Sequence, residues 1–242
     1  MWSRKLNNLF TRTADGQLKI AILIDPDKYN KSVVELANNI PHCFFLVGGS
    51  ELKKSTVHQT IKKIRTISGK PIVIFPGDEK QISPLADGIL FLSLVSGRNP
   101  EYLIGKHVIS APLIKKYNLD SIPVAYLLIN GKKISATQKV SNTKPLSNNR
   151  KIIYNTVLAS CMLGMKMIYM EAGSGAKTSI SISLASYIKM NFKLPLIIGG
   201  GIKSIKQIQQ LDKAGADCVV IGNYLEKNPL FLSEIKNYRS WN

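Results

Sequence analysis

Short runs of β-branched and aliphatic residues alternate with longer amphipathic segments along the whole chain. These runs predict eight strands, near residues 20–25, 43–47, 71–75, 88–92, 123–129, 166–171, 195–199 and 217–222. The runs are almost continuously apolar rather than strictly alternating, which is typical of strands buried on both faces of a parallel sheet. The gaps between the runs are long enough for crossover connections.

Apolar residues at helical spacing predict helices over residues 51–67, 148–163, 177–190 and 203–214. Ser204 is the expected N-cap of the last helix, and Gly215 is its expected C-terminal stop. The gap between the third and fourth strands, which contains PGDEKQISP, is too short for a full barrel helix. One outer helix is therefore expected to be reduced or missing after the third strand.

The alternation of strands and helices favours a single (β/α)8 TIM barrel domain over residues 1–242, with an open doubly wound sheet as the alternative. No linker or low-complexity stretch divides the chain, and residues 130–149 are expected to form an extended loop. The length of 242 residues fits this architecture, which typically needs roughly 250. A composition of 45% hydrophobic and 20% charged residues excludes a disordered chain.

The chain carries 33 Lys and Arg against 15 Asp and Glu, a formal net charge of +18. Such a charge can attract nucleic acid, an anionic membrane or a phosphorylated substrate, or it can be an ordinary solvated surface. The lysines are scattered, without a dense basic block or interleaved aromatic residues. We therefore expect no nucleic-acid partner.

Three cysteines, at positions 43, 161 and 218, lie in apolar runs without metal-ligand spacing. They are expected to be core residues in a reducing compartment. The amino-terminal segment has no apolar run of the kind that a signal peptide needs, and no later stretch approaches the roughly 18 apolar residues of a membrane span, so a cytoplasmic location is expected.

In a (β/α)8 barrel, functional groups gather at the carboxyl ends of the strands, and phosphate commonly binds after strands seven and eight. Here those strands are followed by Gly199-Gly200-Gly201 and by Gly222-Asn223. Glycines let backbone N–H groups approach an anion, so these loops predict a phosphate site. The alternative is that the glycines only make tight turns.

Strand six ends in the run from Tyr169 to Thr178, YMEAGSGAKT. The run is not a nucleotide-binding P-loop, because Ala176 and Glu171 replace the glycines which that motif requires. Glu171 is expected to bind a substrate hydroxyl or to act as a general base; alternatively, it caps the following helix.

Asp25 and Ser50 follow the first and second strands. A carboxylate and a hydroxyl at neighbouring strand ends suit Mg²⁺, which binds few protein oxygens together with ligand phosphates. Alternatively, Asp25 is a turn residue before a proline and Ser50 caps a helix beginning at residue 51. His42, His58 and His107 are expected to lie away from the strand ends, which disfavours acyl-transfer hydrolysis.

Six linked motifs at the predicted strand ends resemble the geranylgeranylglyceryl phosphate synthase family, which includes the heptaprenylglyceryl phosphate synthases. The motifs are IDPDK (24–28), FFLVGGS (44–50), AYLLING (125–131), IYMEAGSGA (168–176), IIGGGIKS (197–204) and ADCVVIGN (216–223). They occur in the family's order over nearly the whole chain from residue 20 onward. The EAGSGA version is similar to that of the larger branch, found in archaea and some bacteria.

The resemblance implies a Mg²⁺-dependent prenyltransferase that moves a prenyl group from its diphosphate to the 3-hydroxyl of sn-glycerol 1-phosphate. By position it implies Asp25 and Ser50 as Mg²⁺ ligands; Lys28 and Tyr126 match motif positions without an assigned role. The implied glycerol 1-phosphate residues are Tyr169, Met170, Glu171, Ala172, Gly173, Ser174, Gly175, Gly200, Gly201, Gly222 and Asn223. Glu171 is the expected catalytic residue.

The family also implies a homo-oligomer, and the basic surface could favour contact with anionic membranes. Two rival functions remain at this stage. A phosphosugar isomerase or another phosphate-binding barrel would share the glycine loops but would need no metal and no apolar groove. A nucleic-acid-binding protein with a vestigial barrel would bind in a strongly salt-dependent way.

Overall fold

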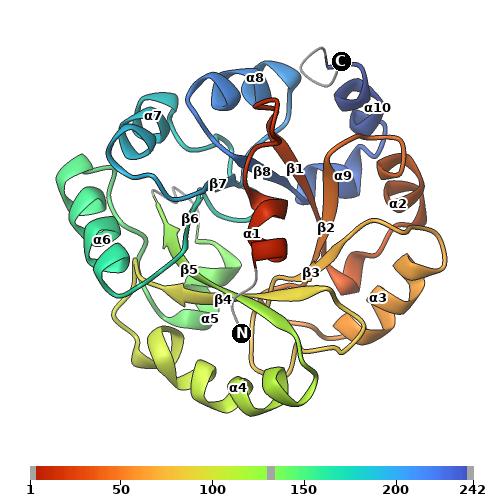
Figure 1. Ribbon diagram of the computed structural model, residues 1–242, viewed down its shortest axis with the longest axis horizontal. Coiled ribbons are helices and arrows are strands. Elements are labelled where there is room, and N and C mark those ends of the chain that lie inside the picture. Colours follow the sequence, from red (N-terminus) through yellow and green to blue (C-terminus); the bar gives the residue numbers. More distant parts are fainter. Residues whose placement is uncertain (1–3, 130–133, 239–242) are drawn as a thin grey trace.

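The computed structural model, which describes residues 4–129 and 134–238, is a closed barrel of eight parallel strands (Figure 1). The strands follow one another in chain order, and β1 pairs with β8 to close the cylinder. They are β1 Lys19–Ile24, β2 Cys43–Val47, β3 Ile72–Ile74, β4 Gly88–Leu94, β5 Asp120–Leu128, β6 Met167–Glu171, β7 Leu196–Gly199 and β8 Cys218–Ile221. The predicted (β/α)8 barrel is confirmed, and the open sheet is excluded.

Helices surround the barrel (Figure 1). The longer ones are α2 Lys31–Ala37, α3 Val57–Arg65, α4 Lys106–Lys116, α6 Arg150–Met162, α7 Ile182–Asn191 and α8 Ile205–Lys213. Shorter elements are α1 Arg4–Phe10, α5 Ala136–Ser141, α9 Asn223–Lys227, α10 Phe231–Lys236, the 3₁₀ turn η1 Pro26–Lys28 and the π-helical turn η2 Glu101–Gly105. Residues 75–87, between β3 and β4, contain no helix, which confirms the predicted missing helix. Within the described ranges, no helix is both long and apolar enough to cross a membrane.

Two of the predicted helices begin later than expected. The helix predicted from residue 51 starts at Val57, where the Thr56 hydroxyl accepts a hydrogen bond from the Gln59 N–H. The helix predicted from residue 177 starts at Ile182, after the N-cap Ser181. Hydrophobic spacing extends past both true starts because it does not register which backbone N–H groups are already bonded elsewhere.

The other helix boundaries largely follow the sequence. Ser204 caps α8 as predicted, and Gly215, which ends it, has a φ of +89°. The segment predicted as an extended loop instead contains α5, capped by Ser135. Residues 130–133 of that segment lie outside the described residues.

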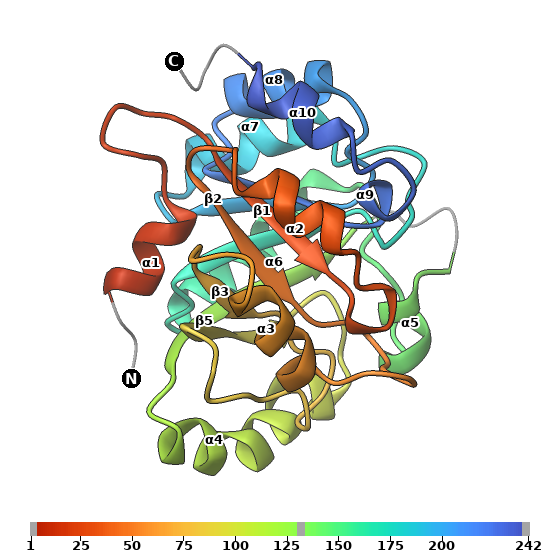
Figure 2. The ribbon, with the colours of Figure 1, turned by 90° about the vertical axis from the view of Figure 1, so that its right-hand side faces the viewer.

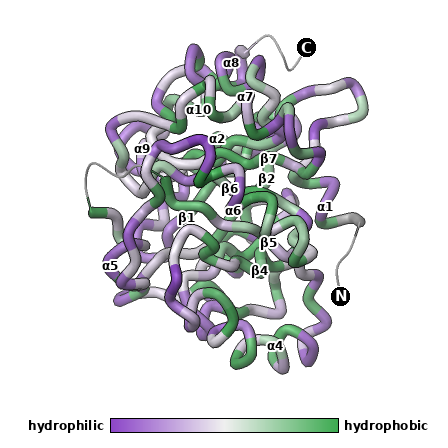
Figure 3. Tube along the Cα trace, turned by 90° about the vertical axis from the view of Figure 1, so that its left-hand side faces the viewer, coloured by the Kyte–Doolittle hydropathy of each residue, from purple (hydrophilic) through white to green (hydrophobic). Residues whose placement is uncertain are grey.

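Strand residues alternate between the barrel interior and a layer beneath the outer helices. On β6, Tyr169 packs inside the barrel with Tyr126 of β5, whereas Ile168 and Met170 pack in the outer layer. This alternation follows from the two-residue repeat of a strand. Figure 3 shows the resulting hydrophobic centre. Among the cysteines, Cys43 and Cys218 are buried in this core, and all three cysteines are free thiols.

The amino-terminal helix α1 closes the barrel floor, opposite α5 and α9 (Figure 2). Its Leu6 and Phe10 are fully buried and join the interior cluster. The Phe10 ring packs edge-on against Phe44 of β2, with ring centroids 4.8 Å apart. Gly88, at the start of β4, leaves room for the Leu6 side chain. The sequence analysis did not predict this helix.

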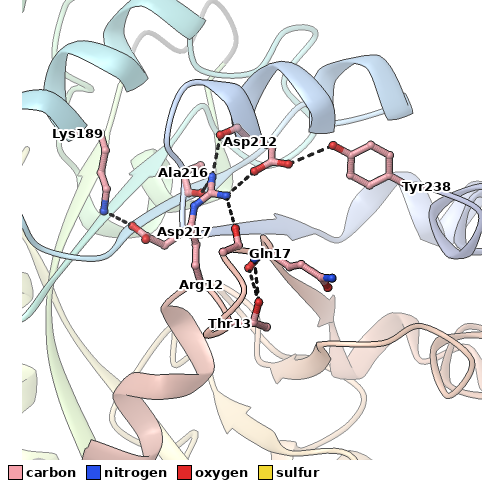
Figure 4. Close-up of polar contacts among 9 residues, drawn as sticks. Arg12, Thr13, Gln17, Lys189, Asp212, Ala216, Asp217 and Tyr238 are labelled. Atoms are coloured by element: carbon pink, nitrogen blue, oxygen red, sulfur yellow. Dashed lines mark hydrogen bonds and ion pairs between the residues drawn. The ribbon is translucent and has the colours of Figure 1, made fainter. Parts of the chain in front are cut away.

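Arg12 ties the segment between α1 and β1 to the end of α8, which precedes the neighbouring strand β8 (Figure 4). Its guanidinium donates hydrogen bonds to the carbonyl oxygens of Asp212, at 2.7 Å, and Ala216, at 2.6 Å. It also forms an ion pair of 2.6 Å with the Asp212 carboxylate, which accepts a further hydrogen bond from the Tyr238 hydroxyl. Both ends of the described chain therefore meet at the carboxyl end of α8.

We expect Phe10→Ala to lower the free energy of unfolding by about 3–5 kcal/mol, because it leaves a cavity beside Phe44. Chemical denaturation measures this change. Asn8→Ala, an exposed position on the same helix, is the matched control and is expected to change stability by less than about 0.5 kcal/mol. Equal effects of the two substitutions would show that α1 does not close the barrel.

Candidate active site

A polar cavity of about 350 Å³ lies at the carboxyl ends of the strands and opens to solvent. It is the face at which barrel enzymes assemble their catalytic groups. Most of the predicted site residues lie in its wall: Asp25, Ser50, Tyr169, Glu171, Ser174, Gly175, Gly200, Gly201, Gly222 and Asn223. The barrel therefore brings residues from five strand ends into one cavity.

Three predicted ligand residues are placed differently. Met170 and Ala172 are buried in the outer layer, between the barrel and its helices, because they alternate with Tyr169 and Glu171. Their side chains do not face the cavity. Gly173 contributes its backbone N–H, which donates a hydrogen bond to Glu171.

Glu171, the last residue of β6, points into the barrel mouth and is 8% exposed. Its Oε1 accepts a hydrogen bond of 2.8 Å from the Gly173 N–H, and its Oε2 accepts one of 3.2 Å from the Tyr169 hydroxyl. Burial raises the pKa of Glu171 to about 7, although both hydrogen bonds act in the opposite direction. Because α7 begins only at Ile182, Glu171 does not cap it, and that alternative is wrong.

Two glycines at the end of β7, Gly199 and Gly200, provide the space that Glu171 occupies. A methyl group on Gly199 would overlap the Tyr169 hydroxyl and one Glu171 oxygen, and a methyl group on Gly200 would overlap the other oxygen. Gly200 also has a φ of +80°, which disfavours any residue with a side chain. The glycines therefore make a tight turn and admit a buried carboxylate at the same time.

Three aromatic rings form the inner wall beneath Glu171. Tyr169 packs against Tyr126 and Phe75, with ring centroids 5.2 Å and 5.5 Å apart respectively. Burial raises the pKa of both tyrosines well above the ordinary value, so both phenols stay protonated at neutral pH. Tyr169 can therefore act as a hydrogen-bond donor to Glu171.

The tips of β1 and β2 bring Asp25 close to the segment that carries Ser50. A methyl group built on Gly49 would lie 3.4 Å from Asp25 Oδ1. Asp25 also caps η1, since its Oδ1 accepts a hydrogen bond of 3.0 Å from the Asp27 N–H. Ser50 does not cap α3, whose N-cap is Thr56, so that alternative is wrong.

The oxygen donors at this end of the cavity are hard ligands of the kind that Mg²⁺ prefers. Asp25, Ser50 and Glu51 all line the cavity wall there. Among the residues that the structure describes, no group of three or more His, Cys, Asp or Glu could hold a metal ion. A cation beside Asp25 would therefore take part of its coordination from a ligand's own oxygens, as Mg²⁺ commonly does with phosphates.

The loops after β6, β7 and β8 meet on the opposite side of the cavity. The Ser174 hydroxyl donates a hydrogen bond of 2.9 Å to Asn223 Oδ1, which ties the β6 loop to the end of β8. Gly201, with a φ of +71°, lies against the backbone of Thr178. These contacts hold several backbone segments and small side chains around a space suited to a phosphate group.

A second, apolar cavity of about 90 Å³ adjoins the polar one. Its wall comes from β4, α4 and the irregular segment 75–87, where the barrel helix that would follow β3 is missing. The apolar lining residues are Ile82, Ile89, Leu90, Phe91, Leu92 and Leu94. The sequence analysis predicted the missing helix but not the cavity that its absence leaves.

The two cavities share one wall, formed by Gly49, Ser50, Phe75, Tyr126 and Thr137. Thr137 lies on α5, in the segment that the sequence analysis took for an extended loop. A hydrogen bond of 2.9 Å from the Tyr102 hydroxyl to the Val140 carbonyl oxygen ties α5 to η2, beside the apolar cavity.

His107 of α4 also belongs to the wall of the apolar cavity, so its expected place away from the site is wrong. It is 7% exposed, and its ring packs edge-on against Phe91, with centroids 4.3 Å apart. Burial lowers the pKa of His107, so the imidazole is neutral at pH 7. It therefore contributes little charge to the wall of this cavity, whose charged lining residues are Asp78, Glu79 and Lys106.

These features describe a (β/α)8 barrel with a polar cavity at its strand ends and an apolar cavity beside it. Residues 16–239 match the PcrB family, and the chain belongs to that family. Several curated proteins are similar to the chain over most of its length. A geranylgeranylglyceryl phosphate synthase of Flavobacterium johnsoniae is 44% identical over 90% of this chain and 91% of its own length. One of Pyrococcus furiosus is 36% identical over 85% of this chain and 83% of its own.

Solved structures show the same fold. The crystal structure of (S)-3-O-geranylgeranylglyceryl phosphate synthase from Thermoplasma acidophilum, in complex with its substrate sn-glycerol-1-phosphate, superposes with a TM-score of 0.87. That protein is 26% identical in sequence, and the match covers 100% of this chain and 99% of that one. The resemblance found in the strand-end motifs is thus confirmed at the level of the family.

We expect Gly200→Ala to lower the free energy of unfolding by about 2–5 kcal/mol, because it adds an overlap with Glu171 to the strain of a positive φ. The matched control is Gly164→Ala, at a φ of +87° with open space around the new methyl group. It carries the backbone strain alone, about 1–2 kcal/mol. Equal losses in the two variants, measured by chemical denaturation, would contradict the assigned role of Gly200.

Proposed function

We propose that the protein is a geranylgeranylglyceryl phosphate synthase, which transfers a geranylgeranyl group from its diphosphate to the 3-hydroxyl of sn-glycerol 1-phosphate. The observation that carries this proposal is the wall shared by the polar and apolar cavities, formed in part by Ser50 and Tyr126. Two substrates, one small and polar and one with a long apolar tail, could meet there. The names of the relatives point to the same reaction.

The glycerol phosphate is proposed to bind between the β6, β7 and β8 ends. Its phosphate would accept hydrogen bonds from backbone N–H groups around Gly201 and Gly222 and from the side-chain NH₂ of Asn223, whose Oδ1 accepts the Ser174 hydroxyl. The related Thermoplasma acidophilum structure, which holds sn-glycerol-1-phosphate, supports this class of ligand. Anchored in this way, the polyol would extend toward Glu171, and a bimolecular attack would become a positioned one.

Glu171 is the proposed general base. The 3-hydroxyl oxygen of the glycerol forms a bond to C1 of the prenyl chain while the bond from C1 to the diphosphate oxygen breaks. The hydroxyl proton passes to the Glu171 carboxylate, and inorganic diphosphate leaves with the bonding electron pair. A pKa of about 7 suits this role, because the carboxylate is substantially ionised at neutral pH and still basic enough to accept the proton.

The prenyl diphosphate is proposed to place its tail in the apolar cavity and its diphosphate near Ser50 and Asp25. These two residues would hold Mg²⁺, which would supply positive charge to the oxygens of the leaving diphosphate. Lys28, in the same cavity wall, lies 3.5 Å from Asp25 and 3.3 Å from Glu226. Its ammonium group adds a further positive charge at this end of the cavity.

The apolar cavity favours this function over the rival phosphosugar isomerase. A small phosphosugar has no apolar tail, so an isomerase acting on it would not need an apolar cavity beside its catalytic carboxylate. The lining of Ile82, Ile89, Phe91 and Leu92 instead suits a prenyl tail, whose burial provides binding energy in proportion to its apolar area.

The proposal predicts an ether product when the purified protein is incubated with Mg²⁺, geranylgeranyl diphosphate and sn-glycerol 1-phosphate. The mirror-image sn-glycerol 3-phosphate is the matched control, because a base and a phosphate site at fixed positions in the proposed site should accept only one hand of the substrate. Chelation of the divalent cation by EDTA should abolish turnover, and added Mg²⁺ should restore it. Mass spectrometry detects the product. An equal yield from both enantiomers, or an undiminished yield in EDTA, would contradict the proposed site.

We expect Glu171→Gln to keep the fold and to lower kcat by about 10²–10⁴-fold, because the amide cannot accept the proton. For the parent enzyme, the pKa of about 7 predicts that kcat falls as the pH drops below 7, since the base becomes protonated. The residual kcat of Glu171→Gln should not fall in this way as the pH drops below 7. Glu35→Gln, on the exposed face of α2, is the control and should behave as the parent does. A variant with parental turnover would remove Glu171 from the mechanism.

A further inference from the structure

Asp27 connects two of the strand ends that form the site. It lies in η1, two residues after Asp25, and its carboxylate accepts three hydrogen bonds from the loop between β2 and α3. The donors are the backbone N–H groups of Lys53, at 2.7 Å, Lys54, at 2.9 Å, and Ser55, at 2.8 Å. One exposed carboxylate thus binds three consecutive N–H groups of a segment with no regular structure.

The start of the same loop is held by another side chain, Gln81 of the segment between β3 and β4. Gln81 is buried; its Nε2 donates a hydrogen bond of 2.7 Å to the Gly49 carbonyl oxygen, and its Oε1 accepts one of 3.3 Å from the Gly49 N–H. The loop is therefore anchored at Gly49 and again at residues 53–55. Ser50 and Glu51, which line the polar cavity, lie between the two anchors.

We infer that Asp27 is a positioning residue that holds Ser50 beside Asp25 by fixing the far end of this loop. This inference rests on the proposed function, in which Asp25 and Ser50 bind the divalent cation. In this arrangement the short turn after β1 has two roles. It carries Asp25 itself, and through the hydrogen bonds of Asp27 it positions the loop that carries Ser50. Because both Asp27 oxygens are already used by N–H groups, the residue acts through the loop rather than as a ligand.

The three contacts require a carboxylate. An aspartate offers two acceptor oxygens with about four lone-pair sites, whereas asparagine offers one oxygen and turns an NH₂ donor toward the other N–H groups. Bonds to the ionised oxygen are also stronger than bonds between neutral groups. Asp27→Asn therefore removes at least one anchor while keeping the size of the side chain.

The test compares Asp27→Asn with Asp87→Asn. Asp87 also accepts a backbone hydrogen bond, of 2.7 Å from the Ile72 N–H, and pairs with Arg65, but it lies at the start of β4, on the opposite face of the barrel. Asp87→Asn should lower the free energy of unfolding without changing the loop between β2 and α3. Asp27→Glu, which keeps two acceptor oxygens on a longer stem, is the second variant in case Asp27→Asn fails to fold.

Two readouts separate positioning from a merely structural role. Hydrogen exchange of the ligand-free protein reports the loop directly, and residues 50–56 should exchange faster in Asp27→Asn but not in Asp87→Asn. In the ether-forming assay, the half-saturating Mg²⁺ concentration should rise about tenfold or more in Asp27→Asn, while the KM for sn-glycerol 1-phosphate changes less than about twofold. Asp27→Glu should shift both readouts in the same direction by a smaller amount.

The inference is overturned if the folded Asp27 variants keep parental exchange in residues 50–56. It is also overturned if the Mg²⁺ dependence is unchanged, or if the KM for the glycerol phosphate rises as much as the Mg²⁺ requirement. A parent protein that makes no ether product would refute the proposed function instead. The exchange measurement would then still decide whether Asp27 anchors the loop, and binding of Mn²⁺ in the presence of inorganic diphosphate would decide whether the anchored loop serves a cation.

Discussion

The site depends on keeping one carboxylate, that of Glu171, out of water at the end of β6. Burial makes its charged form costly, and only the Gly173 N–H and the Tyr169 hydroxyl compensate for it among the described contacts. Space for the carboxylate exists because the neighbouring strand ends in Gly199 and Gly200. Glu171, Gly199 and Gly200 together thus explain the tight turn, the burial that raises the pKa of Glu171 and the position of its carboxylate in the barrel mouth.

The absence of a helix after β3 leaves room for the apolar cavity, which is the second part of the site. In a complete barrel a helix after β3 would cover the outer face near β4. Here the irregular segment 75–87 and α4 leave an apolar cavity that opens onto the wall containing Tyr126. The irregular segment 75–87 therefore forms part of the apolar cavity, whereas the ends of the regular strands form the polar cavity. In the proposed function, the two substrates meet at the residues that line both cavities, Gly49, Ser50, Phe75, Tyr126 and Thr137.

Much of this could be predicted from the sequence, because buried parallel strands and their end residues leave strong local signals. The apolar runs located all eight strands, and their two-residue repeat would also have shown that Met170 and Ala172 face away from Glu171. Other features depend on contacts between distant segments. The late start of α3 coincides with the use of N–H groups at 53–55 by Asp27, and the closure of the floor by α1 depends on Phe44 and Gly88. Hydrophobic spacing carries no information about either.

The central claim is that both substrates meet over Glu171, with the acceptor hydroxyl against the carboxylate and the prenyl carbon beyond it. A crystal structure with sn-glycerol 1-phosphate, Mg²⁺ and an unreactive thio-analogue of geranylgeranyl diphosphate measures this most directly. The account predicts the 3-hydroxyl oxygen about 2.6–3.2 Å from a Glu171 oxygen and about 3–3.5 Å from C1 of the prenyl group. A glycerol phosphate whose 3-hydroxyl points away from Glu171, or a prenyl tail outside the cavity beneath Tyr126, would contradict it.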